Sequence, residues 1–339
     1  MAIPRSPGDG PRDLSRPLEQ LRLLADDRHA GLRLDQVLCL FLPWRSRSSI
    51  HRLLEEGLVS LEDRPPRASC RIRRGDWIVV RIPQPPEPVD VAPGDFEIAI
   101  VHEEKLMIAV DKPAGLAVHP SGRRVHGTLI HYLHKRYRRP EDPAHDVIPR
   151  LLHRIDRETS GVVAVGLDEQ FHSAVRKQFE ERRVEKTYLA VVHGCPSPRE
   201  GRIELPIGPD KRSPIRLKLT VVHGEDGLPA ITRYRVRRAG SRFSLVELWP
   251  ETGRTHQIRV HMEAIGCPLV GDKIYGVAPD IFLACLDREA TLSDEQRARL
   301  VLDRHALHSH RLVFEHPLHG KGFTLEAPLP AELAALVEG

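Results

Sequence analysis

The sequence is poor in cysteine, aromatic residues and lysine, and it lacks any long apolar run. Its five cysteines lie far apart without a Cys-x-x-Cys pair, so they predict neither a disulfide framework nor a thiolate zinc site. Aromatic residues make up 5% of the chain, which argues against an aromatic-packed lectin or porin. Because no segment resembles a signal peptide or a membrane span, we expect a cytoplasmic, reduced protein with no membrane partner.

Nucleotide and metal motifs are absent as well. No G-x-G-x-x-G follows a predicted strand and no G-x-x-x-x-G-K-[ST] occurs, so dinucleotide and nucleoside-triphosphate sites lack their usual phosphate cradles. His256 and His261 are five residues apart and would not share a helix face as zinc ligands do. His305, His308 and His310 have no acidic or cysteine partner placed by spacing, which favours structural histidines. We therefore expect no metal and no cofactor.

Arginine, by contrast, is abundant and unevenly distributed. Only nine of the 51 basic residues are lysine, and the formal net charge is +4. Residues 31–82 contain ten arginines and six acidic residues, so this stretch holds the whole net charge. The overall bias towards arginine is what genomic base composition would produce. The local cluster still indicates a nucleic-acid partner, because the guanidinium group suits phosphates and base edges.

The N-terminal part predicts a small helical module. Residues 1–30 predict a polar, flexible lead-in that is broken by several Pro and Gly residues. Residues 31–82 then predict two short helices, which end at Pro43 and near Gly57, followed by two strands. The module is smaller than a usual domain.

A proline-rich stretch separates this module from a larger domain. Residues 83–95 predict a semi-rigid linker, since five prolines occur in the fourteen residues from Ile82 to Asp95. Residues 96–335 predict an α+β domain with a mainly antiparallel sheet, because hairpin-like strands alternate irregularly with helices. Helices are expected over 128–138 and 168–183. The expected strands lie at 97–101, 107–111, 161–166, 187–193, 202–206, 215–222, 232–237 and 243–249.

Residues 151–166, LLHRIDRETSGVVAVG, form the segment richest in possible chemistry. Asp156 is a carboxylate in a largely apolar approach, with Arg154 and Arg157 beside it and a Thr-Ser-Gly turn after it. Nearby arginines would keep such a carboxylate ionised, and it could act as a nucleophile or a base. Spacing alone nevertheless favours an ordinary salt-bridged aspartate at the end of a strand.

A second dense segment is ETGRTHQIRVH at residues 251–261. If it is helical, Arg259 shares a face with Ile258 and Met262. Taken alone, Arg254 and Arg259 are phosphate contacts or surface charges.

The segment HRIDRETSG at 153–161 is one of six that occur in a characteristic order. The others are DKPAGLAVHP (111–120), EKTYLAVVHG (185–194), ETGRTHQIRVH (251–261), GDKIYG (271–276) and RHALHSHRLVFEHP (304–317). Together they resemble the RluA-type family of RNA pseudouridine synthases. Upstream, GLRLDQVL and SRSSIHRLLEEGLVS look like the S-four-type RNA-binding domain that is often fused to this family. The resemblance covers about residues 30–335, and six motifs in register make it specific.

The resemblance implies a fold and a set of roles. The expected fold is α+β, with a central, mainly antiparallel mixed β-sheet flanked by helices and a small N-terminal αα-ββ RNA-binding domain. Asp156 would start the cleavage of the uridine glycosidic bond, and Arg259 would pair with it. Tyr188 would stack on the extruded uracil, and Arg154 would help evict the base or fill its place. The other expected RNA contacts are Arg157, Arg254, His256, Arg47 and Arg52.

The function implied is isomerisation of specific uridines to pseudouridine. Large-subunit ribosomal RNA is the favoured substrate, because family members with this N-terminal module mostly act on it. Transfer RNA is the alternative substrate, and a non-catalytic RNA-binding ribosome-assembly factor is the alternative function. A hydrolase that pairs Asp156 with Glu158 is disfavoured, because two residues on one turn do not set the separation that such chemistry needs. RNA is the expected partner, and no obligate protein partner is implied.

Three features depart from the family pattern or lie outside it. Ile155 replaces the more usual Leu before the aspartate, a volume-conserving change. Glu62-Asp63 stands where Asn-Gly is usual, which predicts a longer hairpin loop in place of a type I′ turn. Residues 277–303 resemble a variable insertion and carry no predicted role.

Overall fold

The computed structural model describes residues 20–42, 47–81, 96–120, 127–142, 145–286 and 292–338. The chain divides into two compact units, Met1–Glu87 and Pro88–Gly339, and each is described by itself. The predicted linker at 83–95 lies outside the described residues. Within the described ranges, no helix is both long and apolar enough to cross a membrane.

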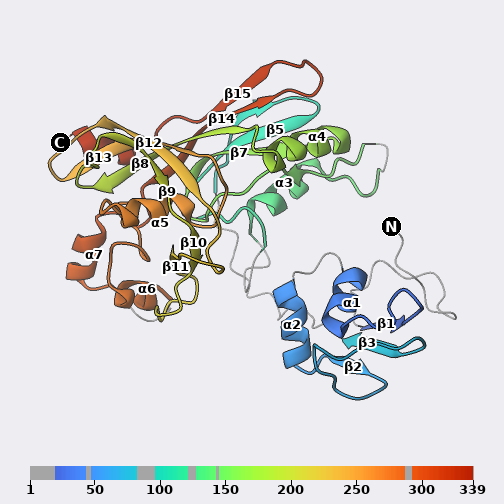
Figure 1. Ribbon diagram of the computed structural model, residues 1–339. Coiled ribbons are helices and arrows are strands. Elements are labelled where there is room, and N and C mark those ends of the chain that lie inside the picture. The colour runs from blue at the N-terminus through green and yellow to red at the C-terminus, as the bar shows by residue number, and fades with distance from the viewer. Residues whose placement is uncertain are drawn as a thin grey trace. The chain divides into compact units, whose positions relative to one another are not determined.

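The N-terminal unit packs two helices on a small antiparallel sheet (Figure 1). The helices are α1 (Leu34–Phe41) and α2 (Arg47–Glu55), and the strand order is β1 (Gln20–Leu24), β3 (Trp77–Arg81), β2 (Val59–Leu61). The two predicted helices and the two predicted strands are therefore present.

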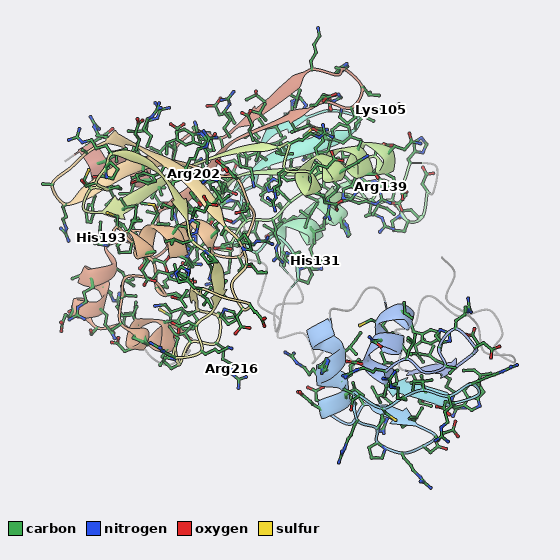
Figure 2. All side chains as sticks on the ribbon, viewed as in Figure 1. Lys105, His131, Arg139, His193, Arg202 and Arg216 are labelled. Atoms are coloured by element: carbon green, nitrogen blue, oxygen red, sulfur yellow. The ribbon has the colours of Figure 1, made fainter. Side chains whose placement is uncertain are left out.

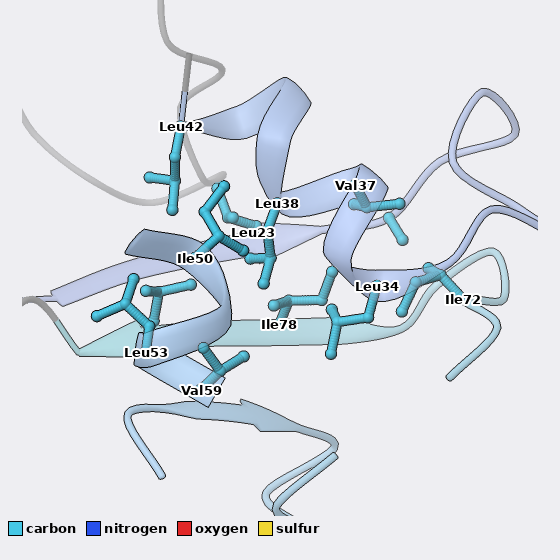
Figure 3. Close-up of a cluster of buried hydrophobic side chains, with 12 residues drawn as sticks. Leu23, Leu34, Val37, Leu38, Leu42, Ile50, Leu53, Val59, Ile72 and Ile78 are labelled. Atoms are coloured by element: carbon cyan, nitrogen blue, oxygen red, sulfur yellow. The ribbon is translucent and has the colours of Figure 1, made fainter. Parts of the chain in front are cut away.

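The core of this unit follows from helical spacing. Leu34 and Leu38 lie four residues apart on α1, Ile50 and Leu53 lie three apart on α2, and all four are buried. Their side chains face Ile78 of β3, as Figure 3 shows. A single apolar cluster thus holds helices and sheet together.

The expectation that residues 1–30 form a flexible lead-in is wrong for residues 20–24. Gln20–Leu24 form β1, which pairs with all five residues of β3. The physical reason is the alternation of this segment, in which Leu21 and Leu23 face the core and the residues beside them are exposed. The small sheet therefore has one strand more than the predicted αα-ββ order.

The connection from β2 to β3 is long, at residues 62–76, but the expected loss of a type I′ turn is wrong at Glu62-Asp63. Both residues have left-handed backbone, with φ of 48° and 58°, as a type I′ turn requires. Two backbone hydrogen bonds of 2.9 and 3.0 Å between Leu61 and Arg64 close the turn. The Glu62 carboxylate in addition accepts the N–H of Trp77 at 2.6 Å, so this side chain supports a geometry that glycine usually provides.

The larger unit contains a mixed sheet in which, among the described strands, only β7 and β14 pair in parallel. Its main path runs β4-β5-β7-β14-β8-β13-β12-β9, with β15 beside β14 and β6 beside β7. The edge strand β9 carries Arg202 (Figure 2). The strands are β4 (Ala99–Glu103), β5 (Met107–Lys112), β6 (Arg150–Leu151), β7 (Ser160–Gly166), β8 (Glu185–His193), β9 (Glu200–Glu204), β12 (Ile231–Arg238), β13 (Phe243–Pro250), β14 (Leu307–Glu315) and β15 (Gly322–Glu326). A separate hairpin is formed by β10 (Ile207–Pro209) and β11 (Leu219–Val221). The predicted α+β class with a mainly antiparallel mixed sheet is confirmed.

Helices cover both faces of this sheet. They are α3 (Leu129–Tyr137), α4 (Glu169–Glu180), α5 (Gln257–Ala264), α6 (Pro279–Leu286), α7 (Asp294–Leu300) and α8 (Ala331–Glu338). On β7, Val162 and Ala164 pack with α4, whereas Val163 and Val165 pack with α3 on the opposite face. Because both faces are buried, the strand is a continuous apolar run. Helices α6 and α7 occupy the insertion at 277–303.

The turn before β7 is held close to β14 by a glycine. Gly161 has φ of +109°, and a Cβ built on it would lie 2.2 Å from the carbonyl oxygen of Ser309. Only glycine fits this close approach of two backbones. The parallel pairing of β7 with β14 therefore fixes where the turn carrying Asp156 lies.

Candidate active site

A cavity of about 840 Å³ brings together three segments that are distant in sequence. These are the turn before β7, the start of β8 and the loop that leads into α5. The seven candidate residues of the larger unit all line it: Arg154, Asp156, Arg157, Tyr188, Arg254, His256 and Arg259. The remaining two candidates belong to the N-terminal unit, where Arg52 is exposed on α2 and the Arg47 side chain lies outside the described residues.

An ion pair joins two of these segments. The Nη1 atom of Arg259 lies 3.1 Å from Oδ2 of Asp156. Arg259 is almost fully buried, whereas 32% of the Asp156 side chain is exposed. The Asp156 carboxylate is therefore held by the buried Arg259 guanidinium while it remains accessible from the cavity.

A second carboxylate, that of Asp272, fixes the orientation of the Arg259 side chain. Asp272 accepts from Nε of Arg259 at 2.6 Å and from Nη2 at 2.9 Å, and it is fully buried. The N–H groups of Ile274 and Tyr275 also donate to Asp272, at 2.9 and 3.1 Å. Burial alone would raise the pKa of the Asp272 carboxyl, but Arg259 and these donors lower it to about 2. The bidentate contact leaves a single nitrogen of Arg259 free for Asp156.

The charge state of Asp156 follows from the same pair. Burial would raise the pKa of its carboxyl, but the charge of Arg259, with smaller effects of His256 and His305 and of the hydrogen bond from Arg259, lowers this pKa overall. The pKa of Arg259 is raised by its two carboxylate partners against the effect of burial. At neutral pH the site therefore presents an ionised carboxylate beside a permanently charged guanidinium.

Tyr188 forms another wall of the cavity. It lies on the face of β8 that also carries Ala190 and Val192, and it packs against their apolar cluster. Burial, and secondarily the charge of Asp156, raises the pKa of its phenol to about 12. The ring is thus a neutral aromatic surface near the carboxylate, of the kind on which nucleobases stack.

A buried lysine cross-links the turn that carries Asp156 to neighbouring backbone. The Nζ atom of Lys112 donates to the carbonyl oxygens of Pro113 at 2.7 Å, Leu116 at 2.8 Å and Arg157 at 3.0 Å. Burial, with a contribution from Arg304, lowers its pKa to about 7. Because Arg157 follows Asp156 directly, this cross-link restricts the backbone of the carboxylate.

Two histidines hold the same turn from the side of β14. His305 Nε2 lies 2.8 Å from Thr159 Oγ1, and His308 Nδ1 lies 2.9 Å from Ser160 Oγ. Burial lowers the pKa of both imidazoles to about 4, so both rings are neutral at neutral pH. Both rings thus make the buried hydrogen bonds that are typical of structural histidines. Among the described residues, no group of three metal-ligating side chains is placed to hold a metal ion.

Glu158 is engaged elsewhere. Lys273 donates to its carboxylate at 2.6 Å, and Glu158 does not line the cavity. The geometry therefore gives no support to a hydrolytic carboxylate pair with Asp156.

His256 marks the entry to α5. It is the N-cap residue and has left-handed backbone with φ of 56°, which is unusual outside glycine. Its Nδ1 atom lies 2.8 Å from the Tyr275 hydroxyl, and burial lowers its pKa to about 4. A neutral imidazole is thus placed beside the ion pair.

Asp272 and Lys112 were not predicted as site residues. Asp272 lies inside the motif GDKIYG and Lys112 lies inside DKPAGLAVHP. These motifs were the sequence signal that could have pointed to the two residues. Only the folded chain shows that one binds Arg259 and the other the Asp156 turn.

Known proteins resemble this chain in sequence and in structure. Residues 106–264 match the sequence profile of a family described as RNA pseudouridylate synthase. The chain is 33% identical to an uncharacterised RNA pseudouridine synthase of Bacillus subtilis, over 95% of this chain and 98% of that protein. It is 36% identical to the ribosomal large subunit pseudouridine synthase D of Neisseria meningitidis serogroup B, over 91% and 78%. The solved structure of human RNA pseudouridylate synthase domain containing 4 matches with a TM-score of 0.51 and 28% identity, over 70% and 90%.

Replacing Asp272 by asparagine tests the pairing of Arg259. We expect Asp272→Asn to lower the free energy of unfolding by about 3–5 kcal/mol at pH 7, because a buried guanidinium loses its bidentate partner. The measurement is urea denaturation. The control Asp226→Asn removes an exposed ion pair with Lys211 and should change the free energy of unfolding little. Equal effects of the two substitutions would contradict the structural role of Asp272.

Stability should fall as the pH is lowered from about 6.5 towards 4. An unfolded histidine titrates near 6.5, whereas folded His305 and His308 titrate near 4, so the unfolded chain binds more protons in this window. Each such histidine contributes about 1 kcal/mol per pH unit. His308→Gln should make the decline shallower by one such contribution when urea unfolding is followed at pH 7, 6 and 5. An unchanged slope in the variant would show that His308 is not held neutral.

Proposed function

Because the chain belongs to the RNA pseudouridine synthase family, we propose that it converts specific uridines of large-subunit ribosomal RNA into pseudouridine. The reaction is an isomerisation in which the C–N glycosidic bond breaks, uracil turns and a C–C bond forms. The observation that carries the proposal is the Asp156–Arg259 ion pair at 3.1 Å in a cavity that Tyr188 also lines. The ribosomal substrate is supported by the large-subunit enzyme that is 36% identical to this chain.

The target base must first leave the RNA stack. Flipping a base out of a folded RNA costs a few kcal/mol, and stacking on Tyr188 offsets about 1–3 kcal/mol of this. Arg154 is exposed at the cavity and has no carboxylate partner among the described residues. Its planar guanidinium can take the place of the extruded base between neighbouring bases.

Asp156 then begins the chemistry. An ionised carboxylate can attack the sugar carbon or abstract a proton, and both routes need the charge that Arg259 preserves. The bidentate grip of Asp272 keeps the guanidinium in place while the charge on Asp156 changes. The neutral phenol of Tyr188 adds no competing charge near the base.

We also propose that the N-terminal unit is an S-four-type RNA-binding domain. In its described part, six exposed arginines have no carboxylate partner: Arg52, Arg64, Arg67, Arg71, Arg73 and Arg81. Such side chains can neutralise backbone phosphates without reading the sequence. Phosphate contacts of this kind would hold the RNA while the larger unit acts on one uridine.

An assay on labelled RNA separates this function from its alternatives. Large-subunit ribosomal RNA and transfer RNA are incubated with the protein, and the digested nucleosides are separated by chromatography. Pseudouridine in the ribosomal RNA supports the proposal, and pseudouridine only in transfer RNA identifies the other substrate. RNA binding without product would indicate an assembly factor, and free uracil would indicate a hydrolase.

Asp156→Asn should reduce pseudouridine formation at least about 100-fold, because the amide can act neither as a nucleophile nor as a base. RNA affinity should change little, since the substitution preserves shape. Product is measured by nucleoside chromatography and affinity by filter binding, with the exposed Asp226→Asn as control. Turnover retained by Asp156→Asn would remove this residue from the chemistry.

The double substitution Arg47→Gln/Arg52→Gln should weaken RNA binding and flatten its salt dependence. Each lost phosphate contact lowers the slope of log K against log salt by about 0.7–0.9. Arg28→Gln is the control in the same unit, because Arg28 is already paired with Asp26 at 2.6 Å. Equal slopes for the double variant and the control would refute an RNA contact at α2.

A further inference from the structure

Two cations on one wall of the cavity have no role in the ion-pair network around Asp156. Arg182 lies in the turn between α4 and β8, and Lys186 is the second residue of β8. Both line the cavity, and within the described residues neither forms a salt bridge with a carboxylate. Arg182 directly follows the C-cap residue of α4, and its left-handed backbone, with φ of 59°, is of the kind that commonly ends a helix.

Two neighbouring carboxylates, at the end of α4, are already engaged with other cations. Glu180 binds Arg176 at 3.1 Å, and Glu181 binds Arg183 at 2.7 Å. The Lys186 ammonium donates a hydrogen bond to the carbonyl oxygen of Thr252, at the long distance of 3.4 Å. Burial, and next the charge of Arg182, lowers the pKa of Lys186 to about 8. Two like charges thus lie near each other without an anion between them.

We propose that Arg182 and Lys186 form a phosphate-binding subsite for the RNA backbone beside the flipped uridine. The inference rests on the proposed function, since it assigns a second contact to the same substrate. A phosphate would supply the anionic partner that both cations lack, with the guanidinium binding two oxygens and the ammonium a third. It would also relieve the repulsion between them.

The geometry of β8 connects this subsite to the base. Residues two apart on a strand point to the same face, so Lys186 and Tyr188 both face the cavity. Their separation along the strand is about 7 Å, from a rise of about 3.3 Å per residue. Within a nucleotide, the ribose joins base and phosphate over a comparable span. A uracil stacked on Tyr188 therefore carries its phosphate towards Lys186 and Arg182.

Arg182→Gln and Lys186→Gln test the subsite against a matched control. Arg183→Gln changes the adjacent arginine, which is paired with Glu181 and does not line the cavity. Fluorescein-labelled octauridylate is titrated at 50–300 mM KCl and followed by anisotropy. Each test variant should lower the slope of log K against log salt by about 0.7 relative to wild type. On ribosomal RNA, KM should rise several-fold with kcat unchanged, since a phosphate contact acts equally on bound substrate and transition state.

Slopes and KM values equal to those of Arg183→Gln would overturn the inference. Should a variant fold poorly, trace acetylation of the wild-type protein gives a second measurement by mass spectrometry. Octauridylate should slow the acetylation of Lys186 several-fold relative to exposed Lys177, and equal protection of the two lysines would also overturn it. Absence of pseudouridine with wild-type protein would refute the proposed function, while the octauridylate data would still decide the subsite.

Discussion

The active-site geometry depends on one guanidinium shared by two carboxylates. Arg259 gives two nitrogens to Asp272 and one to Asp156, and it is almost fully buried. A buried charge is tolerated only when it is paired and hydrogen-bonded, and the bidentate contact with Asp272 satisfies that condition independently of substrate. Asp156 can therefore engage a reacting nucleoside without leaving Arg259 uncompensated.

Hydrogen bonds fix the backbone around Asp156, just as Arg259 keeps its carboxylate ionised. Lys112 binds the carbonyl of Arg157 from one side, and His305 binds Thr159 from the other. Gly161 lets this turn approach β14 where the sheet has its parallel pair. These contacts come from strands that are adjacent in space and distant in sequence, so the position of the carboxylate is a property of the assembled sheet.

Local pattern predicted much of the fold, because alternation and helical spacing are local signals. The α+β class, helix α4 and the strands around Asp156 follow from it. Strand β1 was missed, since its short Gln20–Leu24 pattern follows a proline-rich start and needs β3 to become a strand. The approach of Arg259 to Asp156 was expected only from the family resemblance. No local rule joins residues 103 positions apart, and the same holds for Asp272 and Lys112.

Positive and negative side chains occupy different parts of the cavity, in an arrangement that suits a polyanionic substrate. Asp156 lines the cavity and shares the Arg259 guanidinium with the buried Asp272, and the adjacent imidazoles are neutral, so this ion-pair cluster carries net negative charge. Such a site would by itself repel RNA. Arg154, Arg182, Lys186 and Arg254 also line the cavity without carboxylate partners in the described chain, and their summed charge exceeds that of the cluster. Unpaired cations around an anionic centre attract the phosphate backbone and still leave the carboxylate ionised for the base.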